Sequence, residues 1–325
     1  MSLLSHSDVR RQSRGVFAQF GDLWKKNAEI NAALPRRDCA ELKDSGLGKF
    51  AVFVAMGASL EEQIPVLKKY RDRFDLITCD KGFGVLLDHG IKADCVQIAD
   101  ASIPFKWLAP YVDQTEGVKL ISTAYANPEW TKAWKGDRYF YLNVDAIDTQ
   151  HTFTPYFDGG LRLIPASSNI SNAMVVFWTG CMDKHIENFG NYEKYLLVGY
   201  DYSWRPEGNY YAFSTPKPKA FYMTHMSLTD INNDVVRCSE NLMFSAKWLY
   251  MYLTTYHMLP VVNCSGRGVL DVPSRGNLET HLKRINTDPT ARQRVVDTYH
   301  NARADWKSYQ TSENAFANAK EALWQ

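Results

Sequence analysis

Three aspartates, Asp80, Asp94 and Asp100, stand close together in the sequence, each at the end of an apolar segment. Two neighbouring carboxylates could share a hard cation such as Mg²⁺ with the oxygens of a phosphate. Asp80 and Asp94 are equally well explained as turn or cap residues, which is a common role of aspartate. Asp100 is the hardest to explain in that way, so we predict that it is catalytic and that Asp80 binds substrate beside it.

The segment Gly57-Ala58-Ser59 follows a long apolar run and precedes a stretch of helical spacing. Gly57 would let the backbone approach a phosphate, and Ser59 would add a hydroxyl beside the N–H donors of the helix N-terminus. The alternative is an ordinary strand-to-helix turn that Ser59 caps. Neither GxGxxG nor GxxxxGK[ST] occurs here, so both interpretations stay open.

Further polar candidates follow in the second half of the chain. Asn169 and Ser171 open a helix, where they could bind a ribose, a base or a phosphate, or could cap the helix. Asp201 ends an apolar, strand-like segment and is the second acidic candidate. Asn263 ends another such segment and is included among the predicted binding residues.

Residues 202–235 are rich in aromatic and polar side chains, a composition that long functional loops can have. Tyr211 could present a flat face to a base or a sugar, and His225 could act as a general base. The same aromatic residues could instead bury the loop. Arg267 stands between two glycines and could bind a phosphate or a carboxylate through two hydrogen bonds, or could belong to a surface turn.

These residues need a fold that brings the ends of several strands together. Apolar runs of strand length alternate with helical spacing from residue 50 onward, which predicts a Rossmann-like, doubly wound α/β fold with a mostly parallel sheet. Ligands bind such sheets at the carboxyl ends of the strands. The predicted strands are 50–56, 74–79, 95–98, 120–124, 139–144, 195–198 and 260–263; helices are expected over about 9–33, from 60, and over 83–89, 170–179 and 239–257, with a turn at 80–82.

Three parts follow from this pattern: an N-terminal helical lead-in (1–48), the Rossmann-like domain (49–272) and a C-terminal helical extension (273–325). Two stretches of the extension, 278–285 and 291–306, each carry one apolar stripe. We therefore expect them to pack on the domain or to join copies of the chain in a homo-oligomer.

The composition excludes several classes of function. The 325 residues include 37 Lys and Arg against 36 Asp and Glu, a net charge of +1, so no overall field attracts nucleic acid or an anionic membrane. The apolar runs are far shorter than the ~18 residues that span a bilayer, and no secretory signal opens the sequence, so we expect a cytoplasmic protein. The six cysteines lack the short spacings of a zinc site and are expected to be reduced.

Taken together, the segments resemble the MptE-like and motility-accessory-factor family. Residues 51–102 follow its pattern of strand, GPSL, helix, strand, Asp, helix, gI.PD, strand and Asp. SSNISNAMVVFWTGC and YLLVGYDYSW are similar to its GN-helix and lvGqDl segments, and VVNCSGRGVL is similar to its iNateGGa segment. The resemblance covers roughly residues 50–270. One half also resembles thiamin pyrophosphokinases, and the other half resembles bacterial sialyltransferases.

The resemblance implies a nucleotide-dependent transferase with one of two activities. The first is a glycosyltransferase that uses a CMP-activated nonulosonic, sialic-acid-like sugar and an unspecified acceptor, with Asp100 near the phosphate. The second is a diphosphokinase that transfers diphosphate from ATP to a small pterin-like hydroxymethyl substrate, with Mg²⁺ held by Asp80 and Asp100. The aromatic loop favours the glycosyltransferase. A third alternative is a nucleotide-binding protein without turnover, which Ala58, Ser168 and Tyr200 would allow because they depart from the family pattern.

Overall fold

A parallel sheet of eight strands forms the centre of the computed structural model, which describes residues 6–144, 147–165, 169–180, 188–214, 225–256 and 259–304. The spatial order of the strands is β10-β7-β1-β2-β3-β4-β5-β6, and each pairing is parallel. The predicted Rossmann-like α/β fold is confirmed. The strands are β1 (Phe50–Val54), β2 (Asp75–Cys79), β3 (Cys95–Ile98), β4 (Lys119–Thr123), β5 (Arg138–Val144), β6 (Arg162–Pro165), β7 (Lys194–Val198) and β10 (Val261–Asn263).

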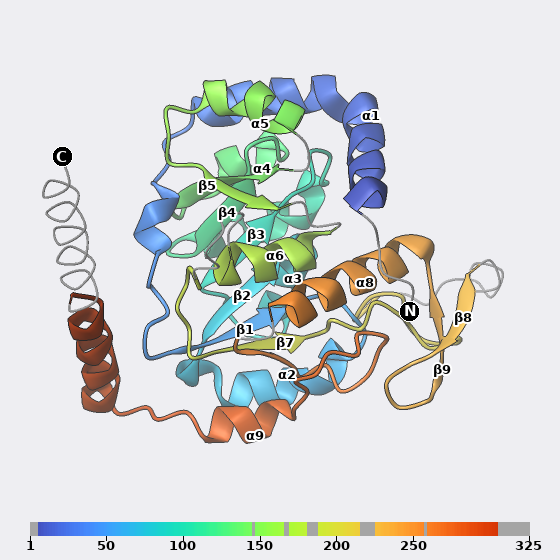
Figure 1. Ribbon diagram of the computed structural model, residues 1–325, viewed down its shortest axis with the longest axis vertical. Coiled ribbons are helices and arrows are strands. Elements are labelled where there is room, and N and C mark those ends of the chain that lie inside the picture. The colour runs from blue at the N-terminus through green and yellow to red at the C-terminus, as the bar shows by residue number, and fades with distance from the viewer. Residues whose placement is uncertain are drawn as a thin grey trace, which may run out of the picture.

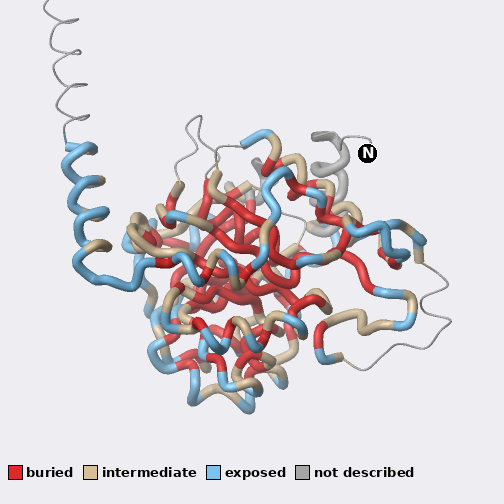
Figure 2. The backbone as a smooth tube through the Cα atoms, turned by 90° about the horizontal axis from the view of Figure 1, so that it is seen from below, coloured by how far each residue is buried: buried red, intermediate tan, exposed pale blue. Residues whose placement is uncertain are grey.

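The central strands form where the chain is continuously apolar, because helices cover both faces of a parallel sheet. In β1 every residue after Phe50 is buried, and in β7 every residue after Lys194 is buried. Figure 2 shows the buried segments gathered in the middle of the molecule and the exposed segments around them. The sheet is therefore the hydrophobic core as well as the frame for the site.

Helices surround the sheet on several sides (Figure 1). In that view α6 and α8 lie in front of the sheet, α2 and α9 lie below it near β1 and β7, and α1, α4 and α5 lie above it near β4 and β5. The helices are α1 (His6–Ala32), α2 (Leu60–Lys69), α3 (Asp80–Asp88), α4 (Pro128–Ala133), α5 (Ile147–Phe153), α6 (Ile170–Thr179), α8 (Glu240–Thr255) and α9 (Leu278–Lys283).

The order of the strands creates a crevice at one edge of the sheet. The chain passes outward from β1 through β2, β3, β4 and β5 to β6, and then returns to form β7 on the other side of β1. Connections therefore leave the carboxyl ends of β1 and β7 in opposite directions, which opens the space where doubly wound sheets bind ligands.

The turn predicted at residues 80–82 is wrong, because these residues form the first turn of α3. Two glycines, Gly82 and Gly84, disfavour a helix on intrinsic propensity. Packing overrides that preference: a Cβ atom on Gly82 would lie 2.1 Å from Thr78 Oγ1, so only glycine lets the helix start so close to β2. Asp80 is consequently a helix N-terminal residue.

Several further elements were not predicted: the helices α4 and α5, the strand β6 and the two strands of a hairpin. The short strand β6 contains Arg162 and Pro165, which mask its apolar character in the sequence. Residues 202–235 were predicted as a loop, but β8 (Met226–Thr229) pairs with β9 (Val235–Cys238) in an antiparallel hairpin that begins there. The hairpin is largely exposed, so it lacks the apolar run of a core strand.

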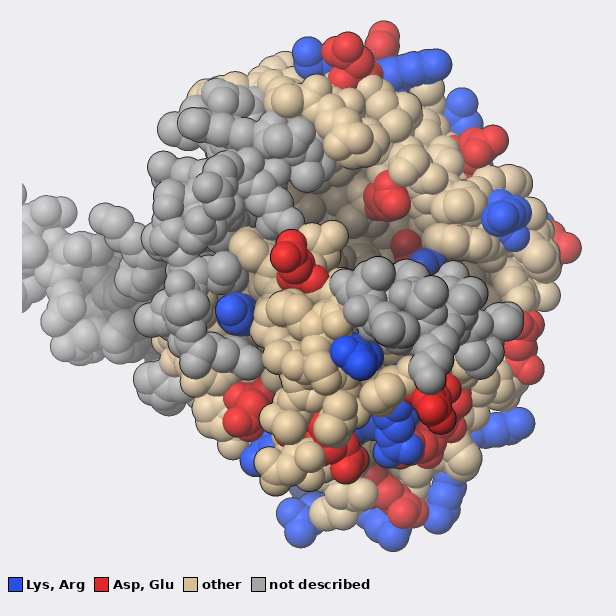
Figure 3. Space-filling view, turned by 90° about the vertical axis from the view of Figure 1, so that its right-hand side faces the viewer, with Lys and Arg blue, Asp and Glu red and all other residues tan. Residues whose placement is uncertain are grey.

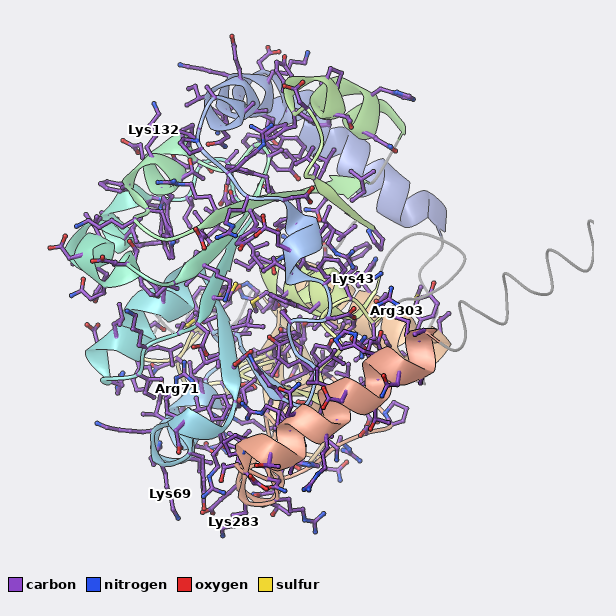
Figure 4. The ribbon with its side chains drawn as sticks, turned by 90° about the vertical axis from the view of Figure 1, so that its left-hand side faces the viewer. Lys43, Lys69, Arg71, Lys132, Lys283 and Arg303 are labelled. Carbon is purple, nitrogen blue, oxygen red and sulfur yellow. The ribbon has the colours of Figure 1, made fainter. Side chains whose placement is uncertain are left out.

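The C-terminal segments pack on the outside of the domain. On the face shown in Figure 4, Lys69 and Lys283 lie together, and both ammonium groups contact Glu279 of α9, at 3.0 Å and 3.4 Å. A last helix covers residues 289–304, and Arg303 from this helix pairs with Asp44 at 2.7 Å. The division of the chain into three parts stays a prediction.

Two statements of composition can be compared with the structure. Five cysteines in the described residues are free and buried, and Cys181 and Ser168 lie outside the described residues. Within the described ranges, helices are too short or too polar to cross a membrane.

Candidate functional site

A cavity of about 590 Å³ lies at the carboxyl ends of six neighbouring strands, from β7 through β1 to β5. Figure 3 shows this side of the molecule, with a hollow bordered by acidic and mostly uncharged atoms. The N-terminal end of α6 and the middle of α1 complete the walls. Six of the predicted site residues line the cavity: Gly57, Asp80, Asp100, Asn169, Ser171 and Tyr211.

Two carboxylates line the cavity, Asp80 after β2 and Asp100 after β3. Asp80 Oδ1 accepts a hydrogen bond from the Lys81 N–H at 2.6 Å, and Asp100 Oδ1 accepts hydrogen bonds from the N–H and the hydroxyl of Ser102. Burial raises the pKa of Asp80 above its ordinary value, and the negative charge of Asp100 contributes in the same direction. The sequence therefore identified two carboxylates that share one cavity and influence each other.

Asp80 and Asp100 are also the side chains that could bind Mg²⁺ in this cavity. Within the described residues, no group of three or more His, Cys, Asp and Glu side chains could hold a metal ion. Mg²⁺ in phosphate-transfer sites is commonly held by one or two carboxylates, and the substrate phosphates and water supply the other ligands. Asp80 and Asp100 fit that arrangement and would hold the ion only together with a bound phosphate.

Lys81 is a cavity residue that the sequence analysis missed. Its ammonium lies 4.1 Å from the ring centroid of Tyr211 and 4.6 Å from that of Trp107. These cation–π contacts hold a positive charge beside the two carboxylates. The sequence did contain a signal for Lys81, because it directly follows Asp80 at the end of a predicted strand. The wrong prediction of a turn at residues 80–82 hid that signal.

The N-terminus of α6 faces the cavity through Asn169, Ile170 and Ser171. Asn169 Oδ1 accepts hydrogen bonds from the Asn172 N–H at 2.9 Å and from the Ser171 hydroxyl at 2.8 Å, so both side chains serve the cap. The first N–H groups of the helix precede its internal hydrogen bonds and attract anions. The predicted polar residues thus shape a helix terminus rather than each offering an unused side chain.

Ser59 and Asp201 lie beside the cavity and bind each other. Ser59 is fully buried, and it donates its N–H to Asp201 Oδ2 at 2.8 Å and its hydroxyl to Asp201 Oδ1 at 2.5 Å. Burial raises the pKa of Asp201 to about 6, although both hydrogen bonds and Arg267 oppose this rise. The groups that we expected to contact a phosphate are therefore engaged within the fold.

Arg267 belongs to the same cluster. It contacts Glu62 at 3.1 Å and Asp201 at 3.8 Å, and it lines a second cavity of about 290 Å³ together with these two acids. Gly57 is required by this packing, because a Cβ atom there would lie 2.5 Å from Gly199 O and 2.7 Å from Asp201 Cγ. The close approach predicted for Gly57 is an approach to the protein's own backbone.

The structure does not bring Asn263 and His225 to the cavity wall. Asn263 is buried, donates to Leu270 O at 3.0 Å and accepts from the Ser265 N–H at 3.0 Å, so its amide supports the loop after β10. The His225 ring packs edge-on against Trp204, with the centroids 5.1 Å apart. Among the described residues, the titratable groups at the cavity are instead the two aspartates, Lys81, Cys79 and several tyrosines.

Comparison with known proteins shows which family this chain belongs to. A solved structure of a Maf glycosyltransferase from Magnetospirillum magneticum AMB-1 matches with a TM-score of 0.61 and 18% identity over 85% of this chain and 41% of that one, which shows a shared fold. An uncharacterized protein of Treponema pallidum (strain Nichols) is 29% identical over 86 residues, 26% of this chain and 41% of that protein. The match thus spans less than half of either protein. The family model for 6-hydroxymethylpterin diphosphokinase MptE-like proteins matches residues 26–204, more than half of the chain, so the chain belongs to the MptE-like family.

Proposed function

We propose that this chain is a nucleotide-dependent transferase, and that it is a glycosyltransferase whose donor is a CMP-activated nonulosonic sugar. The observation that carries the proposal is one cavity that holds an anion-binding helix end, Lys81 and a pair of carboxylates. Its volume lies within the usual range of about 300–1,000 Å³ for small-molecule sites. The family and the shared fold both point to proteins named as transferases, which supports group transfer.

In the proposed reaction, the α6 N-terminus and Lys81 bind the phosphate of the donor. The bond between the anomeric carbon and the phosphate oxygen breaks, and its electron pair leaves with CMP. The acceptor oxygen bonds to the same carbon, and its proton passes to a carboxylate. Asp80 suits that role, because a raised pKa makes a carboxylate a better base near neutral pH. Positioning and charge neutralisation would supply most of the catalysis.

A second candidate is a diphosphokinase, favoured by the name of the family and by the placement of Asp80 and Asp100 at one cavity. Asp80 and Asp100 would then hold Mg²⁺ together with the phosphates of ATP, and the ion would supply neutralisation of the charge on the transferred group. This candidate requires metal for nucleotide binding. The glycosyltransferase does not require it.

Thermal-shift measurements with CMP, CMP-sialic acid, ATP and AMP, each with and without Mg²⁺, separate the candidates. A ligand at 100 times its Kd stabilises by about 2.7 kcal/mol, which is readily detected. We expect CMP compounds to stabilise the protein without metal. A shift only with ATP and Mg²⁺ would support the diphosphokinase, and no shift with any nucleotide would contradict both.

Three variants make the measurement specific to the cavity. Lys81→Met is expected to weaken CMP binding about tenfold, since one charge-assisted phosphate contact is lost. Lys132→Met is the matched control, because Lys132 is exposed on α4, on the side shown in Figure 4 and away from the hollow in Figure 3. Asp100→Ala should lower transferase activity in part, whereas it should abolish a metal-dependent ATP shift.

A further inference from the structure

The end of the cavity near β4 and β5 differs chemically from the end that holds Lys81. Its walls come from Phe20 and Trp24 of α1, Tyr125 after β4 and Asn143 of β5. Among the described residues that line the cavity, Lys81 is the single Lys or Arg, and it follows β2. This end is therefore aromatic and uncharged, which does not suit a phosphate.

Trp24 is held in a fixed position at this end. Its indole stacks on the ring of Tyr125, with the centroids 4.2 Å apart and an interplanar angle of 6°. One turn further along α1, Asn27 donates two hydrogen bonds, to Tyr125 O at 3.1 Å and to Ala101 O at 3.0 Å. Because these bonds join α1 to the loops after β3 and β4, the half-buried indole is a preformed part of the cavity wall.

Phe20 extends the aromatic wall toward solvent. It lies one turn before Trp24 on the same helix, and the residue is 37% exposed. Aromatic side chains placed four residues apart lie on one helix face. The cavity thus has an apolar wall that the fold itself does not fully cover.

Asn143 supplies an unsatisfied polar group next to this wall. It is 9% exposed, and its Oδ1 has no hydrogen-bond partner, while its Nδ2 contacts the Tyr125 hydroxyl at 3.5 Å. A buried acceptor without a donor costs free energy, and such groups in native proteins commonly meet a ligand or an ordered water. Oδ1 is itself buried, so a donor O–H or N–H from a ligand would satisfy it once the amide turns toward the cavity.

We propose that Trp24, Phe20 and Asn143 form a subsite for an uncharged, hydroxyl-bearing ring, such as a pyranose. The C–H groups of such a ring give it an apolar face that can pack on the aromatic wall, and a hydroxyl at its edge can donate to Asn143 Oδ1. Asp80 and Asp100 lie between this subsite and the strands at the switch point. Under the proposed glycosyltransferase function this ring would be the acceptor sugar, which rests on that function; the binding of the ring to the subsite does not depend on it.

Ligand-observed saturation-transfer NMR with simple methyl glycosides tests this subsite directly. The probes are the methyl glycosides of glucose, galactose, mannose and N-acetylglucosamine, and the variants are Trp24→Leu and Asn143→Leu. We expect saturation transfer to the ring C–H protons of at least one glycoside with the unaltered protein. Each variant should weaken that binding about tenfold.

Two further variants keep the test interpretable. Trp24→Phe retains an aromatic wall and should retain most of the binding even if Trp24→Leu folds poorly. Lys81→Met should weaken CMP binding and leave glycoside binding unchanged, whereas Asn143→Leu should weaken glycoside binding and leave CMP binding unchanged. Failure of the proposed function would then appear as absent CMP binding, independently of the glycosides. The inference is overturned if none of the glycosides receives saturation, or if Trp24→Leu and Asn143→Leu bind them as the unaltered protein does.

Discussion

Asp201 is a buried carboxylate whose ionisation costs stability. Burial raises its pKa to about 6 in the folded protein, whereas an unfolded aspartate titrates near pH 3.9. Between these values the folded state binds more protons, so this group stabilises the fold below about pH 4, and its contribution is lost as the pH rises through 6. The difference between the folded and unfolded pKa values of Asp201 corresponds to roughly 3 kcal/mol.

Urea unfolding of the unaltered protein and of Asp201→Asn between pH 4 and pH 7 isolates this contribution. The asparagine does not ionise, so the difference between the two free energies of unfolding should change by a few kcal/mol over this range, with the unaltered protein relatively more stable at low pH. A difference that is independent of pH would contradict the raised pKa. Ser59→Ala should lower the free energy of unfolding at every pH in this range, since it removes a hydrogen bond to Asp201.

Gly57 should be intolerant of a side chain. The atoms that a Cβ would meet at 2.5 Å and 2.7 Å belong to Gly199 O and to the buried Asp201, neither of which can move away easily. Gly57→Ala is expected to lower the free energy of unfolding by about 1–3 kcal/mol.

Gly21→Ala is the matched control for this substitution. A Cβ on Gly21 would lie at an ordinary 3.5 Å from the Phe17 ring, within the interior of α1. Alanine favours a helix more than glycine does, so Gly21→Ala should stabilise by about 0.5–1 kcal/mol. Equal effects of the two substitutions in denaturant unfolding would contradict this account of Gly57.

At the scale of elements, α1 is fixed to the sheet by polar groups. Asn31 is fully buried; it donates to Ala124 O at 3.0 Å and to Ala126 O at 2.9 Å, and it accepts from the Thr131 hydroxyl at 2.6 Å. Asn31→Ala would leave these groups without partners, at a cost of about 2–4 kcal/mol.

Hydrogen exchange reports where that loss acts. We expect faster exchange in α1 and in the loop after β4, and unchanged exchange in β1, because β1 has no part in these hydrogen bonds. Glu29→Ala, an exposed change on the same helix, should leave exchange in α1 nearly unaltered. Uniformly faster exchange across the sheet would show that Asn31 supports the whole fold instead.

The sequence predicts those helices and strands whose local pattern of apolar residues agrees with the way they pack in the folded protein. The core strands were predicted because they are apolar on both faces, and α6 was predicted at Ile170–Thr179, where the structure has it. The first turn of α3 and the strand β6 were not predicted, since Gly82, Arg162 and Pro165 contradict the local pattern and only tertiary contacts explain them.

The site was predictable to a similar extent. The rule that ligands bind at the carboxyl ends of parallel strands identified Asp80 and Asp100, which line one cavity. The sequence could not show that Ser59 and Asp201 satisfy each other, because this depends on two turns far apart in the chain. Nor could it place Trp24 against Tyr125, since a helix outside the alternating pattern gives no signal of where it packs.

At the scale of the whole molecule, the last helix should be separable from the nucleotide site. Its described contacts with the domain are polar and partly exposed, including the pair between Arg303 and Asp44 at 2.7 Å and a hydrogen bond from Asn191 to the Tyr299 hydroxyl at 2.6 Å. Pairs of this kind contribute about 0–1 kcal/mol each. Removal of residues 289–325 is therefore expected to lower the free energy of unfolding by about 1–2 kcal/mol and to leave the thermal shift with CMP unchanged.

The same shortened protein tests the homo-oligomer expected from the apolar stripes of the C-terminal segments. An interface formed by these helices would be lost when they are removed. Sedimentation velocity should therefore detect a fall in the mass of the assembly that is larger than the mass of the removed residues alone. An unchanged assembly would place the interface elsewhere on the surface. A loss of the CMP shift would instead contradict the independence of the last helix from the cavity, since Arg303 and Asp44 are not among the residues that line it.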